Sequence, residues 1–286
     1  MQFKVHEWDV QFMTNWRLII SPPCDAATNM AIDEAILQTY IHTGGMPTLR
    51  IYSWHPSAIS LGSSQSPVAA LNLSECLIHK LEFIRRITGG EAIFHDNEIT
   101  YSIVCSKSDL NLSDSVRKSF RILTAFVFNA YREMGFMPCF AGDTVTYQHG
   151  DPSEFCFATT EKFDILLNGK KIGGNAQKRS KDIIFQHGSI PFSLDFAKIK
   201  TFIKEDLGGI EQRVTCLQDE LKRRVSFKEV SRILIEAFKS SYDINFKKSI
   251  LTRAEQDLAH ALNEEKYKTK QWNYFKKASI IKKEQD

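Results

Sequence analysis

The 286-residue sequence lacks the cysteine and charge patterns that define several classes of protein. Its six cysteines are scattered, with no C-x-x-C pair and no spacing typical of zinc ligands. The 37 lysines and arginines barely exceed the 34 aspartates and glutamates, and a net charge of +3 is a weak basic excess for nucleic-acid binding. We therefore expect free thiols, a reducing cytoplasmic location and no nucleic-acid partner.

Long hydrophobic runs are also missing. Charged side chains interrupt the N-terminus within its first seven residues, which is unlike a signal peptide. No apolar stretch is long enough to cross a bilayer as a helix. We expect no membrane partner.

The motifs of several common enzyme classes are absent as well. There is no G-x-x-x-x-G-K-[ST], no G-x-S-x-G, no H-E-x-x-H, and no G-x-G-x-x-G after a strand. These absences disfavour P-loop enzymes, the usual α/β-hydrolases, zincins and simple Rossmann dehydrogenases. We expect no metal site.

The composition that is present, 43% hydrophobic and 25% charged residues, is that of a globular chain with a sizeable core. Periodicity and turn residues predict a mixed sheet with a few helices up to residue 192, then mainly helices. The expected fold class is therefore α/β, of the α+β kind. Predicted helices span 26–40, 113–134, 196–204, 226–242 and 253–266, and predicted strands span 48–54, 58–62, 81–87, 100–105, 163–167 and part of 182–192.

The first segment that could carry chemistry is RRITGGEAIFHD, residues 85–96. Arg85 and Arg86 end a predicted strand, and arginine offers a charged planar fork to phosphate or carboxylate. Gly89 and Gly90 would let backbone N–H groups approach an anion or a carbonyl without a Cβ in the way. The residue types alone favour a plainer interpretation, a hairpin turn with a solvated arginine pair.

The second segment is NGKKIGGNAQKR, residues 168–179. Its Asn-Gly pair predicts a type I′ hairpin turn, because both residues tolerate positive φ. One continuous strand would place four positions on one face: Lys171, Gly173, Asn175 and Gln177. Lys171 could then reach a carbonyl or phosphate above the glycines, or it could simply discourage pairing at a sheet edge.

Two single residues have both a chemical and a structural interpretation. A thiolate at Cys156 would be a strong nucleophile, and a nearby lysine would lower its pKa. A free cysteine between two phenylalanines is more often a small buried hydrophobe. His187 in QHGSI could polarise a substrate, but a hydrogen-bonded structural histidine fits equally well.

In this order, the segments resemble the lipoate–protein ligase and octanoyltransferase family of the biotin/lipoate ligase superfamily. The resemblance covers roughly residues 15 to 280. The Arg-Arg-x-Thr-Gly-Gly and Gly-Lys-Lys-Ile-x-Gly-x-Ala-Gln motifs are specific as a pair. The matching segments are NMAIDEA, LRIYSW, RRITGGEAIFHDNEITYSIV, GKKIGGNAQKR and HGSI, and near the end Lys266-Tyr267 and Trp272-Asn273-Tyr274.

The resemblance implies a fold and two possible chemistries. It implies a mixed, largely antiparallel sheet flanked by helices, as a catalytic domain at 15–205 with a helical extension, 206–286, packed on it. Family members modify one lysine of a lipoyl domain or of the glycine-cleavage H protein. Ligases activate lipoate with ATP and Mg²⁺ through lipoyl-AMP. Octanoyltransferases take the acyl group from acyl carrier protein onto a cysteine, without a cofactor.

The resemblance is closest to the cysteine-dependent octanoyltransferases. Cys156 matches their acyl-accepting cysteine, and Lys171 matches the family lysine that contacts the acyl carbonyl or the adenylate. The Asn-Asp element of most ligases is missing, and Glu91 stands where ligases usually have a third glycine. A carboxylate there would repel an adenylate phosphate. Beyond these catalytic residues, the resemblance implies a substrate-binding set of Arg85, Arg86, Thr88, Gly89, Gly90, His95, Gly173, Gly174, Ala176 and His187.

The leading prediction is transfer of an octanoyl or lipoyl group through Cys156 to a lipoyl-domain lysine. Such a transferase should need neither ATP nor Mg²⁺ and should lose activity on Cys156→Ser. The alternative, an ATP-dependent lipoate–protein ligase, should survive that substitution. A third possibility is a non-catalytic lipoyl-domain or acyl-lysine binding protein, which would bind without turnover.

Overall fold

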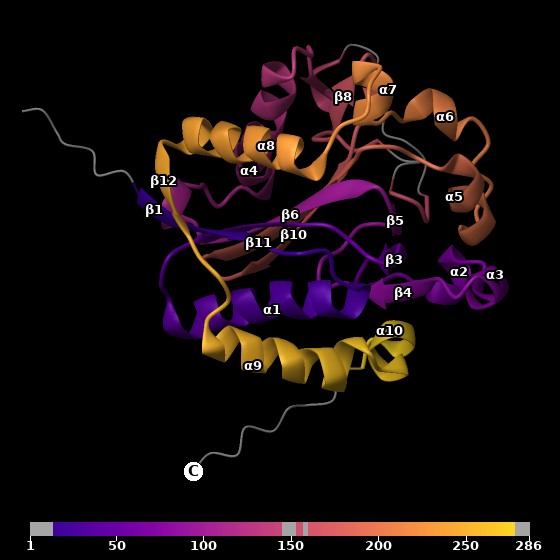
Figure 1. Ribbon diagram of the computed structural model, residues 1–286, viewed down its shortest axis with the longest axis horizontal. Helices are drawn as coiled ribbons and strands as arrows, with labels where there is room; N and C mark the ends of the chain where they lie inside the picture. Colours follow the sequence, from indigo (N-terminus) through magenta and orange to yellow (C-terminus); the bar gives the residue numbers. More distant parts are fainter. Residues whose placement is uncertain (1–13, 145–152, 157–159, 278–286) are drawn as a thin grey trace, which may run out of the picture.

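The computed structural model describes residues 14–144, 153–156 and 160–277, and its centre is a six-stranded sheet (Figure 1). The strands are β1 (Thr14–Ile20), β2 (Thr48–Tyr52), β6 (Glu98–Ser106), β10 (Gly174–Ser180), β11 (Ile183–Pro191) and β12 (Ile244–Lys248). Their order is β10-β11-β6-β2-β1-β12. β1 pairs in parallel with β2 and β12, and the other neighbours are antiparallel. The predicted mixed, largely antiparallel sheet is confirmed.

Helices cover both faces of this sheet (Figure 1). On one face lie α4 (Val116–Glu133) and α8 (Phe227–Tyr242), and on the other lie α1 (Ala26–Thr43) and α9 (Arg253–Leu262). Successive strand residues point to opposite faces. Ile51 therefore joins the core beneath α4 and α8, while Tyr52 joins the core beneath α1. The helix predicted over 253–266 is α-helical only to Leu262, and a π-helical turn (Asn263–Tyr267) and α10 (Lys270–Phe275) follow.

Short-range signals set the start of one helix and the turn of one hairpin. Asp25 caps α1, because its carboxylate accepts a hydrogen bond from the N–H of Thr28 at 2.8 Å. β8 (Ile165–Leu167) and β9 (Lys170–Lys171) form the predicted hairpin, with β7 (Cys139–Phe140) as a third strand. Asn168 and Gly169 in its turn have φ of 49° and 77°, as a type I′ turn requires.

A second small sheet contains the start of the RRITGG segment, and its next strand begins shortly after that segment. It consists of β3 (Ala58–Leu61), β4 (Glu82–Arg85) and β5 (Ile93–His95), in the order β4-β3-β5. The turn between β4 and β5 therefore leaves and re-enters one sheet. The remaining short elements are α2 (Pro67–Ala70), α3 (Leu73–Ile78), α5 (Phe196–Phe202), α6 (Ile210–Arg213), α7 (Leu217–Leu221), and 3₁₀ turns at Ser108–Leu110 and Ala141–Asp143.

The C-terminal part is less purely helical than expected. β12 lies within the segment predicted to be helical, and it forms an edge of the central sheet beside β1. Four of its five side chains are at least partly exposed, so it lacks the apolar run that would reveal a strand. The division at residue 205 stays a prediction. No helix in the described ranges is long and apolar enough to cross a membrane.

Candidate active site

Cys156 lies at the end of a short extended segment that runs beside the chain following the Gly89-Gly90 turn. The N–H of Ala92 donates to the carbonyl of Glu154, and the N–H of Cys156 donates to the carbonyl of Ala92, both at 2.9 Å. Cys156 is 9% exposed. The backbone pairing therefore carries the cysteine to the edge of the RRITGG turn, although 66 residues separate it from Gly90 (156 − 90).

Lys171, the last residue of β9, meets Cys156 in this buried region. Its ammonium lies 3.8 Å from the Cys156 sulfur and donates to the Cys156 carbonyl at 2.6 Å. It also forms an ion pair with Asp164 at 2.7 Å. Burial disfavours its charge, but the Cys156 sulfur, once deprotonated, and the Asp164 carboxylate outweigh burial and raise the pKa of Lys171. Lys171 is therefore a fixed cation beside the sulfur.

The thiol of Cys156 is held in its neutral form at rest. Burial raises the pKa of this thiol, and the neighbouring Lys171 lowers it. Asp164 and Glu91 raise the pKa again, and the net pKa of Cys156 lies above the ordinary value. Lys171 thus lowers the pKa of the thiol, as expected. Without a bound substrate, however, burial has the stronger effect on this pKa.

The chain bends sharply between Lys171 and the next strand. Gly173 has a φ of +77°, and a Cβ added there would lie 2.4 Å from the Ser189 carbonyl oxygen. β9 therefore stays in the β7-β8-β9 sheet, while β10 begins at Gly174 in the central sheet. The prediction of one continuous strand face from Lys171 onward is wrong, because this bend passes the chain from one sheet to the other.

Gly174 directly faces the sulfur. A Cβ added at this position would lie 2.9 Å from the Cys156 sulfur, closer than real Cβ contacts. The glycine thus leaves the sulfur enough room beside β10. The next two residues, Asn175 and Ala176, line the same cavity as Cys156 and Lys171.

Two adjoining cavities lie around these residues. The one at Cys156 has a volume of about 280 Å³, and its apolar lining includes Phe120, Phe163 and Ile93. A second, much narrower cavity of about 20 Å³ extends beneath β5, β10 and β11. The two share three lining residues, Arg86, Ile93 and Ala176. The other residues of the narrow cavity are Met30, Trp54, Ser60, His95, Thr100, Gly174, His187, Gly188 and Ser189.

Arg86 stands in the wall between the two cavities. Its guanidinium donates to the carbonyls of Gly89 and Glu91, at 2.7 and 2.9 Å, and to Ser60 and Thr88. Burial lowers its pKa to about 10, so the group stays charged at neutral pH. Arg86 therefore holds the Gly-Gly turn and places a positive charge at the cavity wall.

Arg85 has a different position from the one expected for a substrate-binding residue. Its side chain donates to five backbone carbonyls and lines neither cavity. Two of these carbonyls belong to α10, and three belong to the loop after β3. The acceptors are Trp272, Asn273, Gly62, Ser63 and Gln65. These hydrogen bonds join α10 to this loop.

Two histidines line the narrow cavity. His187 lies 2.7 Å from the Thr88 hydroxyl through Nε2 and 3.9 Å from Asp33 through Nδ1. Burial lowers the pKa of His187, so the neutral imidazole prevails at neutral pH. His95 is fixed by a 2.8 Å contact to Glu98 and stacks on Trp54 at 3.8 Å between ring centroids.

Three buried carboxylates near the site were missed by the sequence interpretation. Asp164 holds Lys171, Asp33 holds Arg50 at 2.7 Å and faces His187, and Glu98 holds His95. Asp33 lies within the predicted helix 26–40 and Asp164 within the predicted strand 163–167, whereas Glu98 lies two residues before the predicted strand 100–105. An acidic residue inside or at the edge of an element with many apolar residues is the signal that could have pointed to them, because buried charges need partners.

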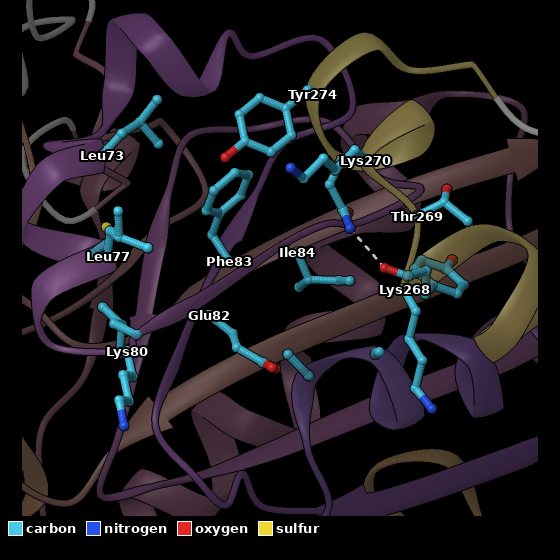
Figure 2. A pocket seen from close by; sticks show the side chains of 16 residues that line it. Leu73, Leu77, Lys80, Glu82, Phe83, Ile84, Lys268, Thr269, Lys270 and Tyr274 are labelled. Atoms are coloured by element: carbon cyan, nitrogen blue, oxygen red, sulfur yellow. Dashed lines mark hydrogen bonds between the residues drawn. The ribbon is translucent and has the colours of Figure 1, made fainter.

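A larger hollow of about 500 Å³ lies elsewhere, between the start of α1, α3, β4 and α10 (Figure 2). Phe83 and Tyr274 pack edge to face in its wall, and Leu73 and Leu77 face them from α3 (Figure 2). No predicted catalytic or substrate-binding residue lines it. Eight of the twelve predicted residues line the two smaller cavities, and the other four, Arg85, Thr88, Gly89 and Gly173, line neither. Within the described ranges, no group of three or more His, Cys, Asp and Glu side chains is arranged to hold a metal ion.

Comparison with known proteins assigns the chain to a family. Residues 25–239 match the model of the lipoyl protein ligase A/B catalytic domain. The chain is 34% identical over 271 residues to octanoyltransferase LipM of Exiguobacterium, covering 91% of this chain and 98% of that protein. It is 30% identical over 273 residues to octanoyltransferase LipM of Brevibacillus brevis, covering 91% and 99%.

A solved structure agrees with these sequence matches. The bi-partite lipoate protein ligase of Thermoplasma acidophilum, described with its E2 lipoyl domain, has a TM-score of 0.77 at 25% identity. The match covers 94% of this chain and 99% of that chain. The chain therefore belongs to the lipoyl protein ligase A/B catalytic domain family and is an acyltransferase.

Proposed function

We propose that the chain transfers an octanoyl group, through a thioester on Cys156, to a lysine of a lipoyl domain. The observation that carries this proposal is the meeting of the Cys156 sulfur and the Lys171 ammonium, 3.8 Å apart, at a cavity with apolar walls. The similarity to octanoyltransferases of the LipM type supports the choice of acyl group.

In the first half-reaction, octanoyl–acyl carrier protein supplies the thioester. The Cys156 sulfur attacks the thioester carbonyl carbon and the carbon–sulfur bond to the carrier breaks. The proton from the Cys156 thiol ends on the carrier sulfur, which leaves as a thiol. Lys171 favours this step twice, because a fixed cation stabilises both the thiolate and the developing oxyanion. The resting thiol, with its raised pKa, keeps the sulfur unreactive until the carbonyl arrives.

The narrow cavity is the proposed place for the acyl chain. Met30, Trp54, Ile93 and Ala176 give it apolar surfaces, and it adjoins the cavity that holds the sulfur. Burying the chain would contribute about 0.8 kcal/mol for each methylene. Side chains must move to admit eight carbons, because the space in the free protein is small.

The polar wall of the narrow cavity would orient the carbonyl end of the chain. Arg86 holds the Gly89-Gly90 turn and Thr88, and Thr88 contacts His187. Arg86, Thr88 and His187 are buried and already hydrogen-bonded to one another. The wall is therefore rigid before substrate binds, which lowers the cost of positioning the thioester.

In the second half-reaction, the acceptor lysine attacks the Cys156 thioester and releases the sulfur. A lipoyl domain or the glycine-cleavage H protein is the proposed acceptor, and no cofactor is proposed. The alternative is an ATP-dependent ligase, which the structural likeness to a lipoate protein ligase favours. In such an enzyme Lys171 would contact an adenylate, and the Glu91 carboxylate in the same cavity would repel the phosphate.

The decisive experiment is incubation with octanoyl–acyl carrier protein without ATP, followed by intact mass measurement. We expect an octanoyl adduct that hydroxylamine removes and that is absent from Cys156→Ser. Addition of a lipoyl domain should move the octanoyl group to its lysine. Modification that requires ATP and persists in Cys156→Ser would instead establish the ligase. Binding of a lipoyl domain without turnover from either donor would leave only a binding function.

A further inference from the structure

The cavity at Cys156 is lined by three carboxylates in different situations: Glu91, Glu161 and Asp164. Asp164 is already engaged, because it pairs with Lys171 and accepts from the N–H of Glu161, both at 2.7 Å. The Glu161 side chain is exposed, whereas Glu91 is half-buried. Within the described part of the chain, the Glu91 carboxylate has no hydrogen-bond or ion-pair partner.

Backbone contacts place Glu91 next to the nucleophile. Its own carbonyl accepts from Arg86 at 2.9 Å, and Ala92, the next residue, pairs with Cys156 through the backbone at 2.9 Å. Burial and nearer charged groups have the largest effects on the pKa values of Cys156 and Lys171. The Glu91 carboxylate has a smaller effect, and it raises both pKa values. Glu91 is thus electrostatically coupled to both groups.

A carboxylate in this position opposes the first half-reaction. It disfavours the Cys156 thiolate, and so works against the cation at Lys171. The second half-reaction has the opposite need. The acceptor lysine arrives as an ammonium, with an ordinary pKa of about 10.4, and it cannot attack a thioester until it loses a proton. Lys171 cannot accept that proton, because it is itself charged.

We propose that Glu91 is the base that accepts a proton from the acceptor lysine, an assignment that rests on the proposed acyl-transfer function. The lysine ammonium binds beside the carboxylate and transfers one proton to it. The amine nitrogen then forms a bond to the thioester carbonyl carbon, and the carbon–sulfur bond breaks. The electron pair of that bond goes to the Cys156 sulfur, which takes the second proton from nitrogen. An amide, a thiol and a protonated Glu91 result.

The test separates the two half-reactions of Glu91→Gln, which keeps the size of the side chain and removes its charge. Acylation of Cys156 by octanoyl–acyl carrier protein should be as fast as in the parent chain or faster. Aminolysis of the acyl-enzyme by a lipoyl domain should slow by about 10²–10⁴, the usual contribution of a general base. Release by hydroxylamine, which is neutral at the assay pH, should be unchanged. Glu91→Asp should restore part of the aminolysis.

Two further variants make the result specific. Glu161→Gln removes another carboxylate from the same cavity, and it should slow aminolysis far less than Glu91→Gln. Glu236→Gln, on the exposed side of α8, should match the parent chain in both half-reactions.

The following outcomes would overturn the assignment. Equal slowing of acylation, aminolysis and hydroxylamine release in Glu91→Gln would mean a structural role. Equal effects of Glu161→Gln and Glu91→Gln would mean that no single base acts. If the parent chain itself formed no acyl-enzyme, the proposed function would fail first, and the role of Glu91 would fail with it.

Discussion

Two buried lysines in this molecule each pair with a carboxylate at 2.7 Å, yet their surroundings differ. Lys171 pairs with Asp164 in the wall of a cavity, 3.8 Å from the Cys156 sulfur. Lys266 pairs with Glu34 of α1, and its ammonium lies 4.0 Å from the centre of the Trp272 ring. One pair faces a space that a substrate could enter, and the other is enclosed by side chains.

The different surroundings of the two lysines also shift their pKa values in opposite directions. Burial lowers the pKa of Lys266, and Glu34 only partly offsets this effect. At Lys171 the Cys156 sulfur, once deprotonated, and the Asp164 carboxylate together outweigh burial and raise the pKa of the lysine. The Lys266 pair links α1 to the C-terminal turn, assisted by a 2.6 Å bond from Tyr267 to Glu34. Similar ion pairs thus lie in the wall of the proposed catalytic cavity in one place and join elements of the fold in another.

Among substitutions that break either ion pair, Lys171→Met should have the largest effect on activity. Acylation of Cys156 should slow by about 10²–10³, comparable to the loss of a group that stabilises an oxyanion. Because the substitution also leaves Asp164 unpaired, the double variant Lys171→Met/Asp164→Asn should regain stability but not activity. Single-turnover acylation and urea unfolding of both variants measure the two effects. Near-parental acylation in the stable double variant would remove Lys171 from the mechanism.

Lys266→Met should affect stability instead of chemistry. Leaving Glu34 charged and unpaired in the interior should lower the free energy of unfolding by about 3–5 kcal/mol. Lys266→Met/Glu34→Gln should recover part of that loss. The acylation rate per folded molecule should stay within a few-fold of the parent chain, measured well below the unfolding midpoint. A loss of acylation rate as large as that expected for Lys171→Met would contradict the proposed difference between the two ion pairs.

Arg85→Met should loosen α10 while leaving the cavity intact. The carbonyls of Trp272 and Asn273 would lose a charged donor, which should cost about 1–3 kcal/mol. Hydrogen exchange should accelerate in α10 and in the loop after β3, and the β8-β9 hairpin should be unaffected. Loss of acylation without faster exchange would instead support the substrate-binding role expected from the sequence.

The smallest expected effect is a shift in the pH dependence of Cys156 alkylation. Burial raises the pKa of this thiol, so its alkylation should require higher pH than that of an exposed cysteine. Asp164 also raises this pKa, and Asp164→Asn should therefore move the alkylation midpoint to lower pH. Mass spectrometry with Cys156→Ser as the control identifies the alkylated residue. A shift to higher pH would mean that Asp164 acts mainly by holding Lys171 in place.

Local chemistry explains which elements were predictable. The carboxylate at Asp25 begins α1, and Asn168-Gly169 closes the β8-β9 hairpin, because both signals act over a few residues. The parallel strands β1 and β12 have no such signal. Thr14 pairs with Ile244, and only the completed sheet gives either strand a partner.

The RRITGG segment shows that local sequence is also insufficient to predict side-chain partners within the site. Arg85 and Arg86 are chemically identical neighbours, and the motif treats them as a pair. Successive residues of an extended chain point to opposite sides, so Arg85 reaches α10 while Arg86 reaches the cavity. Which side became the cavity depended on the packing of β4, β5 and β10, and not on the motif.

The sequence by itself determined the family and the mixed sheet with its helices, and it singled out Cys156 and Lys171 as the candidate catalytic residues. These depend on residue identities and short spacings that can be read along the chain. Only the tertiary structure decided that Asp164 holds Lys171, that Gly173 turns the chain between two sheets, and that Glu91 lines the same cavity as Cys156. Ion pairs and cavities form between segments that are distant in sequence, so their partners exist only once the backbone has brought them together.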